Sequence, residues 1–370
     1  MSEAEDRLRL FKKGDAIEVP FTKVESELRA LWRHAAEGKP GEPRRPVTRA
    51  CLWNLIVAVD TQALVEMKAL TDHVGRQFPA RTILVGPIET HPGEDEGEIY
   101  SFVQAHWRAG EAHATGSEQV TLLSTGAAAT RLPSLVRSLL VPDAPTAMLW
   151  LDTPTHESAV RELTFEVDRL IIDSRSLERE ADLDQYDLLS VHSPSLEFAD
   201  LAWIGISPMR SLAAALFDPP HDPAQLDQLT RVRVTSGIAG TQARALLMLG
   251  WLADRLGWHN LRRQKGSAIA RRWTATRRHG GEVQVELQTE LGGASHGVTG
   301  LLLEKESDRW SLRRDTGAID VTAPGLPMRS QPARSHTNAE LVVAALGARG
   351  RDPSYREGLR KAIEFLQAHS

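Results

Sequence analysis

Apolar residues in the first part of the chain follow two spacings, one typical of buried strands and one typical of helices. CLWNLIVAV, which begins at Cys51, is a nearly continuous apolar run, as in a strand buried on both faces. Apolar residues then recur at helical spacing from Leu64 to Phe78, and ARTILVG forms a second apolar run after Pro79. The alternation continues through PTAMLWLD and RLIIDS. It predicts an α/β fold, a mostly parallel open sheet with flanking helices.

Strands of another kind follow Gln228. SAIARRWTAT, EVQVELQT, GVTGLLLEK and DRWSLRRD carry polar residues at alternate positions, which is typical of an antiparallel sheet with one solvated face. Gly280-Gly281 indicates a hairpin between the first two strands. SFVQAHWRA and EQVTLLS predict an earlier hairpin, PGLPMRSQPARS a loop, and SYREGLRKAIEFLQA a final helix. These patterns predict a smaller α+β region with an antiparallel sheet.

Three domains are expected from these patterns. Residues 1–46 read as an N-terminal arm and linker, because a short amphipathic stretch is followed by KPGEPRRP. The arm can dock on this chain or on another protein. We expect the α/β domain over residues 47–237 and the α+β C-terminal domain over residues 238–370.

The stretch FADLAWIGISPMRSLAAALF joins the two patterns. The apolar run from Leu201 to Ile206 suits either a core strand that feeds a helix or a surface made for a partner. Ser207 is a good N-cap and Pro208 a good first helical residue. Arg210 then lies in the first helical turn, where a cation costs about 0.3–1 kcal/mol. Helix stability does not require this arginine, so we expect it to meet a partner carboxylate, Asp200 or a bound anion.

Composition and charge narrow the classes of function. The chain has 370 residues and a formal net charge of -5, which argues against general binding to nucleic acid or to an anionic membrane. No apolar run approaches the length of a membrane span, and MSEAEDRLRLFKKGDAIEVP lacks an apolar signal core, so we expect a cytoplasmic protein. Cys51 is the single cysteine, which excludes an internal disulfide and a site built from several thiolates.

Nucleotide and metal signatures are absent. The chain has no GxGxxG after its first strand, no GxxxxGK[ST] and no HExxH. We therefore predict no cofactor and no metal. The nearest candidate for an anion cradle is Ser124, Thr125 and Gly126, where a strand leads into a helix. Plain helix capping explains the same residues.

Carboxylates stand after three of the apolar strands. Asp60, Asp152 and Asp173 follow CLWNLIVAV, PTAMLWL and RLII. The carboxyl ends of parallel strands are where ligands bind in open α/β sheets, so these acids could form an active site. They could equally be caps and turn formers, because aspartate is common in both roles.

Several segments together resemble one protein family. Asp200-Leu201-Ala202-Trp203, followed by Ser207-Pro208 and Arg210, resembles the DLAW…TPWR segment of the glucose-6-phosphate dehydrogenase assembly proteins (OpcA). RACLWNLIVAV with PARTILV, EQVTLLSTGAAATRLPSLVRSLLVPDAPTAMLWL, DRLIIDS and LGWLADRLGW resemble other family segments, in the same order. The chain departs from the family at Met209, where a tryptophan is usual, and at Leu151-Asp152, where a tryptophan or glycine often stands.

The resemblance implies a non-catalytic role. Such proteins bind glucose-6-phosphate dehydrogenase and favour its active oligomer, which supports NADPH supply through the oxidative pentose phosphate pathway. The residues that this resemblance and the surface argument nominate for partner contact are Trp203, Ser207, Arg210, Trp150 and Asp152. The alternative from another class is a sugar-phosphate- or nucleotide-binding enzyme that uses the strand-end carboxylates.

Overall fold

The fold is given by a computed structural model of the whole chain. It describes residues 15–37, 47–49, 51–59, 63–87, 97–109, 114–151, 162–193, 195–217, 223–237, 242–291, 297–306, 308–348 and 350–369. The chain divides into two compact units, each assembled from separate segments. Unit 1 comprises residues 1–172, 195–198 and 338–349, and unit 2 comprises residues 173–194, 199–337 and 350–370.

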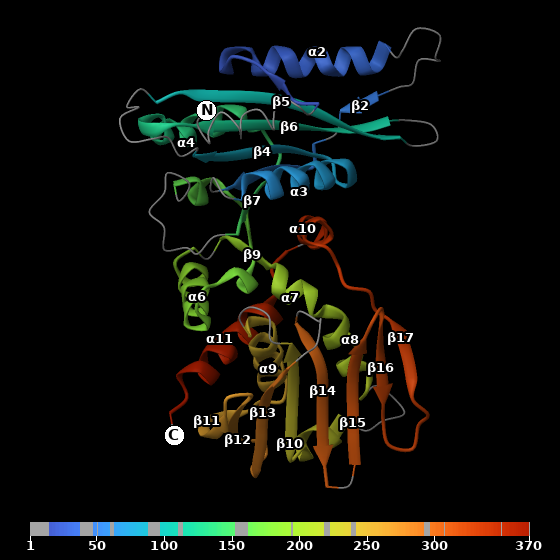
Figure 1. The fold of residues 1–370 in the computed structure, drawn as a ribbon. Coiled ribbons are helices and arrows are strands. Elements are labelled where there is room, and N and C mark those ends of the chain that lie inside the picture. The colour runs from blue at the N-terminus through green and yellow to red at the C-terminus, as the bar shows by residue number, and fades with distance from the viewer. Residues whose placement is uncertain are drawn as a thin grey trace. The chain divides into compact units, whose positions relative to one another are not determined.

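Unit 1 is built on the predicted parallel sheet (Figure 1). Among the described residues this sheet has nine strands, in the order β1-β5-β6-β4-β3-β7-β8-β9 with β2 beside β6. Its elements are β1 (Ile17–Glu18), η1 (Phe21–Lys23), α2 (Val24–Glu37), β2 (Val47–Arg49), β3 (Trp53–Ala58), α3 (Leu64–Gln77), β4 (Ala80–Pro87), β5 (Ile99–Ala109), β6 (Ala114–Ser124), η2 (Gly126–Arg131), α4 (Leu132–Leu139), β7 (Thr146–Trp150), η3 (Thr164–Glu166), β8 (Arg169–Ile172), β9 (Glu197–Asp200) and α10 (Asn338–Gly347).

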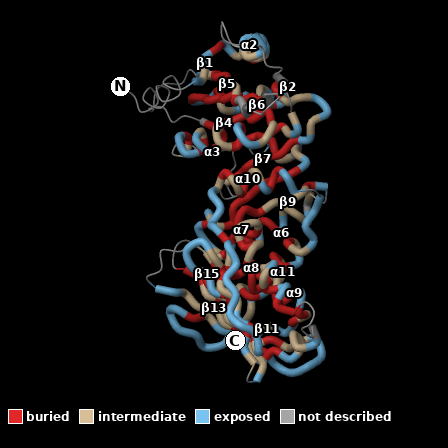
Figure 2. The backbone as a smooth tube through the Cα atoms, turned by 90° about the vertical axis from the view of Figure 1, so that its right-hand side faces the viewer, coloured by how far each residue is buried: buried red, intermediate tan, exposed pale blue. Residues whose placement is uncertain are grey.

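The sequence pattern of unit 1 is confirmed in its main features. Strand β3 pairs in parallel with β4 and β7, β4 with β6, and β7 with β8. The expected hairpin is also present, because β5 and β6 pair antiparallel from Ile99↔Ser124 to Ala109↔Ala114. Every residue of β7 and β8 is buried, as the continuous apolar runs predict (Figure 2). Cys51 precedes β3 and is only half-buried.

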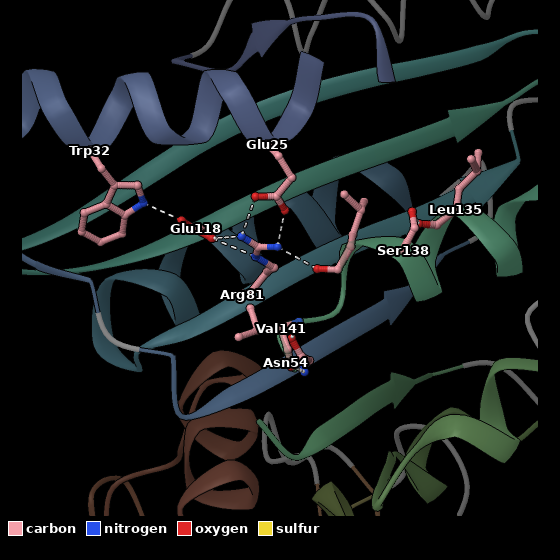
Figure 3. Close-up of polar contacts among 9 residues, drawn as sticks. Glu25, Trp32, Asn54, Arg81, Glu118, Leu135, Ser138 and Val141 are labelled. Carbon is pink, nitrogen blue, oxygen red and sulfur yellow. Dashed lines mark hydrogen bonds and ion pairs between the residues drawn. The ribbon is translucent and has the colours of Figure 1, made fainter. Parts of the chain in front are cut away.

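Residues 15–37 of the N-terminal arm pack on the sheet of their own chain. Strand β1 pairs with β5, and helix α2 packs on the sheet beside them. Below α2, the buried guanidinium of Arg81 donates to Glu25 Oε1 at 2.5 Å, to Glu118 Oε2 at 2.8 Å and to the carbonyl of Leu139 at 2.8 Å (Figure 3). Trp32 Nε1 donates to the other oxygen of Glu118. The arm is therefore held by charge-assisted hydrogen bonds as well as by apolar burial.

Unit 2 is the expected α+β region. Its eight-stranded sheet has the order β11-β12-β13-β10-β14-β15-β16-β17 among the described residues. Its pairs are antiparallel except for β10 with β13, which run parallel. The elements are η4 (Ser174–Ser176), η5 (Glu180–Asp182), α6 (Leu183–His192), α7 (Leu201–Gly205), α8 (Ser207–Ala215), η6 (Pro223–Gln228), β10 (Arg231–Gly237), α9 (Ala243–Arg255), β11 (His259–Ser267), β12 (Ala270–Thr276), β13 (Glu282–Glu290), β14 (Val298–Lys305), β15 (Asp308–Asp315), β16 (Ala318–Thr322), β17 (Arg329–Pro332) and α11 (Pro353–Gln367).

Two local predictions for unit 2 differ from the structure. The apolar run from Leu201 to Ile206 forms helix α7 rather than a strand. PGLPMRSQPARS contains the short edge strand β17, where a loop was expected. The hairpin at Gly280-Gly281 is confirmed, and both glycines have positive φ.

Helices cover one face of the unit 2 sheet, and the other face carries charged side chains. Helices α9 and α11 cross closely, because a Cβ at Gly250 would lie only 2.0 Å from the carbonyl oxygen of Gly358. On the charged face, basic and acidic side chains alternate in sign from β12 to β15 and pair across neighbouring strands. These ion pairs are Arg272–Glu286, Arg233–Glu286, Arg231–Glu304 and Arg309–Glu304.

Candidate functional site

The DLAW…SPMR stretch forms the first two helices after β9. Asp200 ends β9 and caps α7, since its Oδ1 accepts the backbone N–H of Ala202 at 2.8 Å. The same oxygen accepts the N–H of Ser174 at 3.2 Å. A side-chain acceptor at this position satisfies a donor that the first turn leaves open, which explains why the apolar run starts a helix here.

Asp200 is a fully buried acid with a shifted pKa. Burial raises the pKa of its carboxyl to about 6, the charge of Asp173 adds to the rise, and the N–H donors of Ser174 and Ala202 oppose it. Tyr355 Oη donates to Asp200 Oδ2 at 3.3 Å. Burial, together with the neighbouring carboxylate, holds the pKa of the Tyr355 hydroxyl well above its usual value. The pair links the start of α7 to the first turn of α11.

Trp203 makes a second link between the same two helices. Its ring is 3% exposed, and Nε1 donates to Asp352 Oδ2 at 2.7 Å. Asp352 is the N-cap of α11, where its other oxygen accepts the N–H of Tyr355 at 3.2 Å. The rings of Trp203 and Tyr355 also pack with centroids 5.7 Å apart. Trp203 is therefore an internal anchor, and its position holds the residues that follow.

Arg210 lies on the Trp203 ring. Its guanidinium carbon is 3.4 Å from the ring centroid, and Nη2 donates to the Trp203 carbonyl at 3.4 Å. Burial lowers the pKa of Arg210 to about 10, and the nearby charge of Arg255 lowers it further, whereas Asp352 raises it. Within the described part of the chain, Arg210 Nε has no hydrogen-bond partner. That nitrogen is itself buried and is not open to a partner, whereas Arg210 as a whole is half-buried and forms no ion pair among the described residues.

The other partner-contact candidates are Ser207, Trp150 and Asp152. Ser207 is the first residue of α8 rather than its N-cap, which is Ile206, and it is half-buried. Trp150 closes β7 in unit 1 and is 4% exposed, so its ring belongs to a core. Asp152 lies outside the described residues. Within unit 2 the structure brings Trp203 and Arg210 into contact, with Ser207 one turn before the arginine.

In the Ser124–Gly126 turn, Thr125 forms hydrogen bonds with neighbouring residues. Thr125 N–H donates to the Glu98 carbonyl at 3.0 Å, and Thr125 Oγ1 accepts the Glu98 N–H at 2.9 Å. The Ala128 N–H donates back to the Thr125 carbonyl at 3.2 Å. Ser124 is fully buried, and Gly126 has a φ of 47°. These bonds use the backbone donors of Thr125 and Ala128, whereas Ser124 Oγ has no hydrogen-bond partner among the described residues, and the anion site at this turn stays a prediction.

Of the three strand-end carboxylates, Asp173 lies in the described part of the chain. Asp60 and Asp152 lie outside the described residues. Asp173 caps η4 and binds Arg175 through both oxygens, at 2.6 Å and 2.5 Å. No group of three or more His, Cys, Asp or Glu side chains in the described ranges could hold a metal ion. None of the described helices is long and apolar enough to cross a membrane.

Sequence reasoning missed Asp352 and Tyr355. The signal for Asp352 was present, because Asp-Pro before an apolar helical pattern is a typical N-terminus. Its bond with Trp203 spans 149 positions along the chain, and no local pattern reports such a partner.

Family models match both halves of the chain. A model described as the glucose-6-phosphate dehydrogenase subunit N-terminal domain matches residues 71–187, and one described as the C-terminal domain of the same subunit matches residues 196–359. The second match includes Asp200, Trp203, Arg210 and Asp352. The chain belongs to the OpcA family.

OpcA relatives with curated descriptions agree with this assignment. The chain is 30% identical over 271 residues to the OxPP cycle protein OpcA of Nostoc punctiforme, which covers 71% of this chain and 56% of the relative. It is 26% identical over 198 residues to the protein of the same name from Synechocystis, which covers 52% of this chain and 40% of the relative. The chain thus spans about half the length of these OpcA relatives.

Solved structures resemble this OpcA-family chain only distantly. UDP-N-acetylglucosamine 3-dehydrogenase GnnA from Acidithiobacillus ferrooxidans aligns with a TM-score of 0.45 at 9% identity, over 86% of this chain and 97% of that one. A likeness at this level carries no conclusion about activity.

Proposed function

We propose that this OpcA-family chain is a non-catalytic partner of glucose-6-phosphate dehydrogenase that binds the enzyme and favours its active oligomer. The observation that carries the proposal is the ordered match of both subunit-domain models over residues 71–187 and 196–359. The relatives' description as OxPP cycle proteins supports a role in the oxidative pentose phosphate pathway, in the cytoplasm.

Linkage explains how such a partner raises activity without chemistry of its own. A protein that binds only the active oligomer stabilises that oligomer by its differential affinity. The coupling is reciprocal, so a substrate that favours the same oligomer tightens binding of the partner by the same factor. Nothing in this mechanism requires a nucleophile, a general base or a cofactor in the OpcA-family chain.

We place the contact at the start of α8, around Ser207 and Arg210. Arg210 is half-buried and stacked on a tryptophan that is itself fixed by Asp352. A guanidinium held in one orientation loses little conformational entropy when it binds a carboxylate. Arginine is also enriched among residues that dominate binding energy at protein interfaces. In this proposal Trp203 positions Arg210 and does not touch the partner.

Mixing the two purified proteins at micromolar concentration tests the proposal. We expect a larger oligomer mass for the dehydrogenase and a shifted saturation curve for glucose 6-phosphate. An unchanged mass together with an unchanged curve would contradict the proposal.

An alanine variant tests the contact face. Arg210→Ala should weaken binding about tenfold, which corresponds to about 1.4 kcal/mol. Arg351→Ala is the matched control, because Arg351 is exposed beside Asp352 and should leave the affinity unchanged. If Arg210→Ala lowers the melting temperature strongly and leaves affinity intact, the arginine has only an internal role.

A further inference from the structure

One segment of unit 2 differs in charge from the rest of the chain. Residues 255–281, which hold β11, β12 and their flanking turns, contain eight Lys and Arg residues and no Asp or Glu. We call this segment the basic hairpin. The whole chain has a formal net charge of -5, so subtracting +8 leaves -13 on the other 343 residues. Positive charge is therefore concentrated on two adjacent strands of an otherwise acidic chain.

The basic hairpin forms one edge of its sheet. Strand β11 stands at one end of the strand order, and among the described strands only β12 pairs with it (Figure 1). Arg262 and Lys265 on β11 are exposed and form no ion pair in the described part of the chain. Arg263 lies over the buried Trp273 ring, with its guanidinium carbon 5.5 Å from the centroid. Positive charge therefore faces outward along this edge.

Contacts inside the chain neutralise only part of the charge. Arg271 pairs with Glu180 at 2.5 Å and Arg272 with Glu286 at 3.4 Å. Arg277 and Arg278 each donate to a backbone carbonyl, at 3.3 Å and 3.1 Å, which binds a guanidinium without neutralising it. Most of the segment's cations thus lack a carboxylate among the described residues.

Protection of a sheet edge is not a sufficient reason for this charge. One or two lysines, or a bulge, are enough to prevent edge-to-edge pairing. Strand β11 already has register shifts between His259 and Arg262 and between Gln264 and Ser267. Additional like charges raise the repulsion within the hairpin and weaken the fold. Edge protection therefore leaves most of these cations unexplained, and an external acidic group would offset their repulsion.

We propose that the basic hairpin docks on an acidic protein surface, with Arg262 and Lys265 as its principal contacts. The proposal rests on the proposed function and assigns the acidic surface to glucose-6-phosphate dehydrogenase. A nucleic acid is disfavoured, because both tryptophans of the segment, Trp258 and Trp273, are buried and cannot stack on bases. Exposed interfacial charges of this kind act mainly on the association rate and on its salt dependence.

The test measures binding of the full chain to the dehydrogenase at several salt concentrations between about 0.05 M and 0.5 M. The test variant is Arg262→Glu with Lys265→Glu. The control is Arg313→Glu with Arg329→Glu, which changes the same charge at two exposed sites on β15 and β17 of the same sheet. Thermal melts show that both variants fold. A fluorescent DNA duplex serves as a competing probe at each salt concentration.

We expect the test variant to bind the dehydrogenase about tenfold more weakly at low salt, with a flatter dependence on salt than the wild type. The control should bind like the wild type. If the wild type binds and the test variant matches the control, this docking surface is overturned while the proposed function stands. If the wild type does not bind the dehydrogenase at any of the salt concentrations, both the docking surface and the proposed function are refuted. Tighter binding to the duplex than to the dehydrogenase would also overturn the acidic-protein assignment.

Discussion

Replacing Arg169 by alanine should destabilise unit 1 more than any surface substitution. Arg169 is 3% exposed and joins three segments of the unit. Its Nη1 donates to the carbonyls of Ala345 and Ala348 at the end of α10, at 2.6 Å and 2.7 Å. Nε and Nη2 donate to Glu197 Oε2, at 3.1 Å and 2.5 Å, and the guanidinium lies 4.8 Å from the centroid of the Trp53 ring.

The expected magnitude follows from what the substitution leaves behind. Breaking a buried ion pair by removing one partner costs about 3–5 kcal/mol, because the other charge stays uncompensated. The Glu197 side chain is 26% exposed, so water relieves part of that penalty. The carbonyls at the end of α10 lose donors as well, at about 1–3 kcal/mol for each one left unsatisfied. We therefore expect a loss of about 3 kcal/mol or more in the free energy of unfolding.

Urea unfolding followed by tryptophan fluorescence and circular dichroism measures this loss. Arg137→Ala is the control, since Arg137 pairs with Glu166 at 3.2 Å and both side chains are more than 40% exposed. An exposed pair of this kind contributes less than about 1 kcal/mol. If Arg169→Ala costs no more than the control, the guanidinium does not hold α10 in place and the reasoning fails.

Three further predictions concern buried positions. Burial raises the pKa of Asp200 to about 6, so the ionised carboxylate lowers the free energy of unfolding by about 3 kcal/mol above that pH. This free energy rises again as the pH falls from 6 to 4, because the folded protein then takes up the proton first. Asp200→Asn should remove this pH dependence from urea titrations. Burial lowers the pKa of His106, so the unfolded chain takes up the proton first and the free energy of unfolding falls as the pH drops below about 6.5. His106→Gln should reduce this loss of stability at low pH. An unchanged dependence of stability on pH would contradict this assignment. Gly250→Ala should lower the free energy of unfolding by about 1–3 kcal/mol or more, because the new Cβ would overlap the Gly358 carbonyl. Gly347→Ala is the control, since Gly347 has open space around it and its substitution should leave the melting temperature unchanged.

Local sequence patterns predicted the secondary structure correctly where the spacing of apolar residues matches the face that is buried in the fold. The βαβ unit and the two hairpins follow from apolar runs and turn residues, which act over a few neighbouring positions. The run from Leu201 to Ile206 was ambiguous because a short apolar segment suits a strand or a buried helix equally well. Here Asp200 decides for the helix by capping it. Strand β17 has no apolar alternation, because an exposed edge strand has no face to bury.

The candidate site was only partly predictable. Arg210 stood out because its position opposes the helix dipole, and the structure gives it an aromatic ring to lie on. The acids that organise this region are distant in sequence, so Asp352 and its bond to Trp203 could not be inferred from spacing. The charge excess of the basic hairpin was visible in the sequence, but averaging over the whole chain concealed it.

The interleaved path of the chain has a consequence for how the protein is made. Unit 1 contains α10, which packs on α3, yet 161 residues of unit 2, residues 173–194 and 199–337, are translated before α10. When β8 has just been synthesised, helix α10, which completes unit 1, has therefore not yet been translated. We expect fragments that stop near residue 172 to stay incomplete and to require a chaperone, and a single proteolytic cut cannot separate the two units into whole domains.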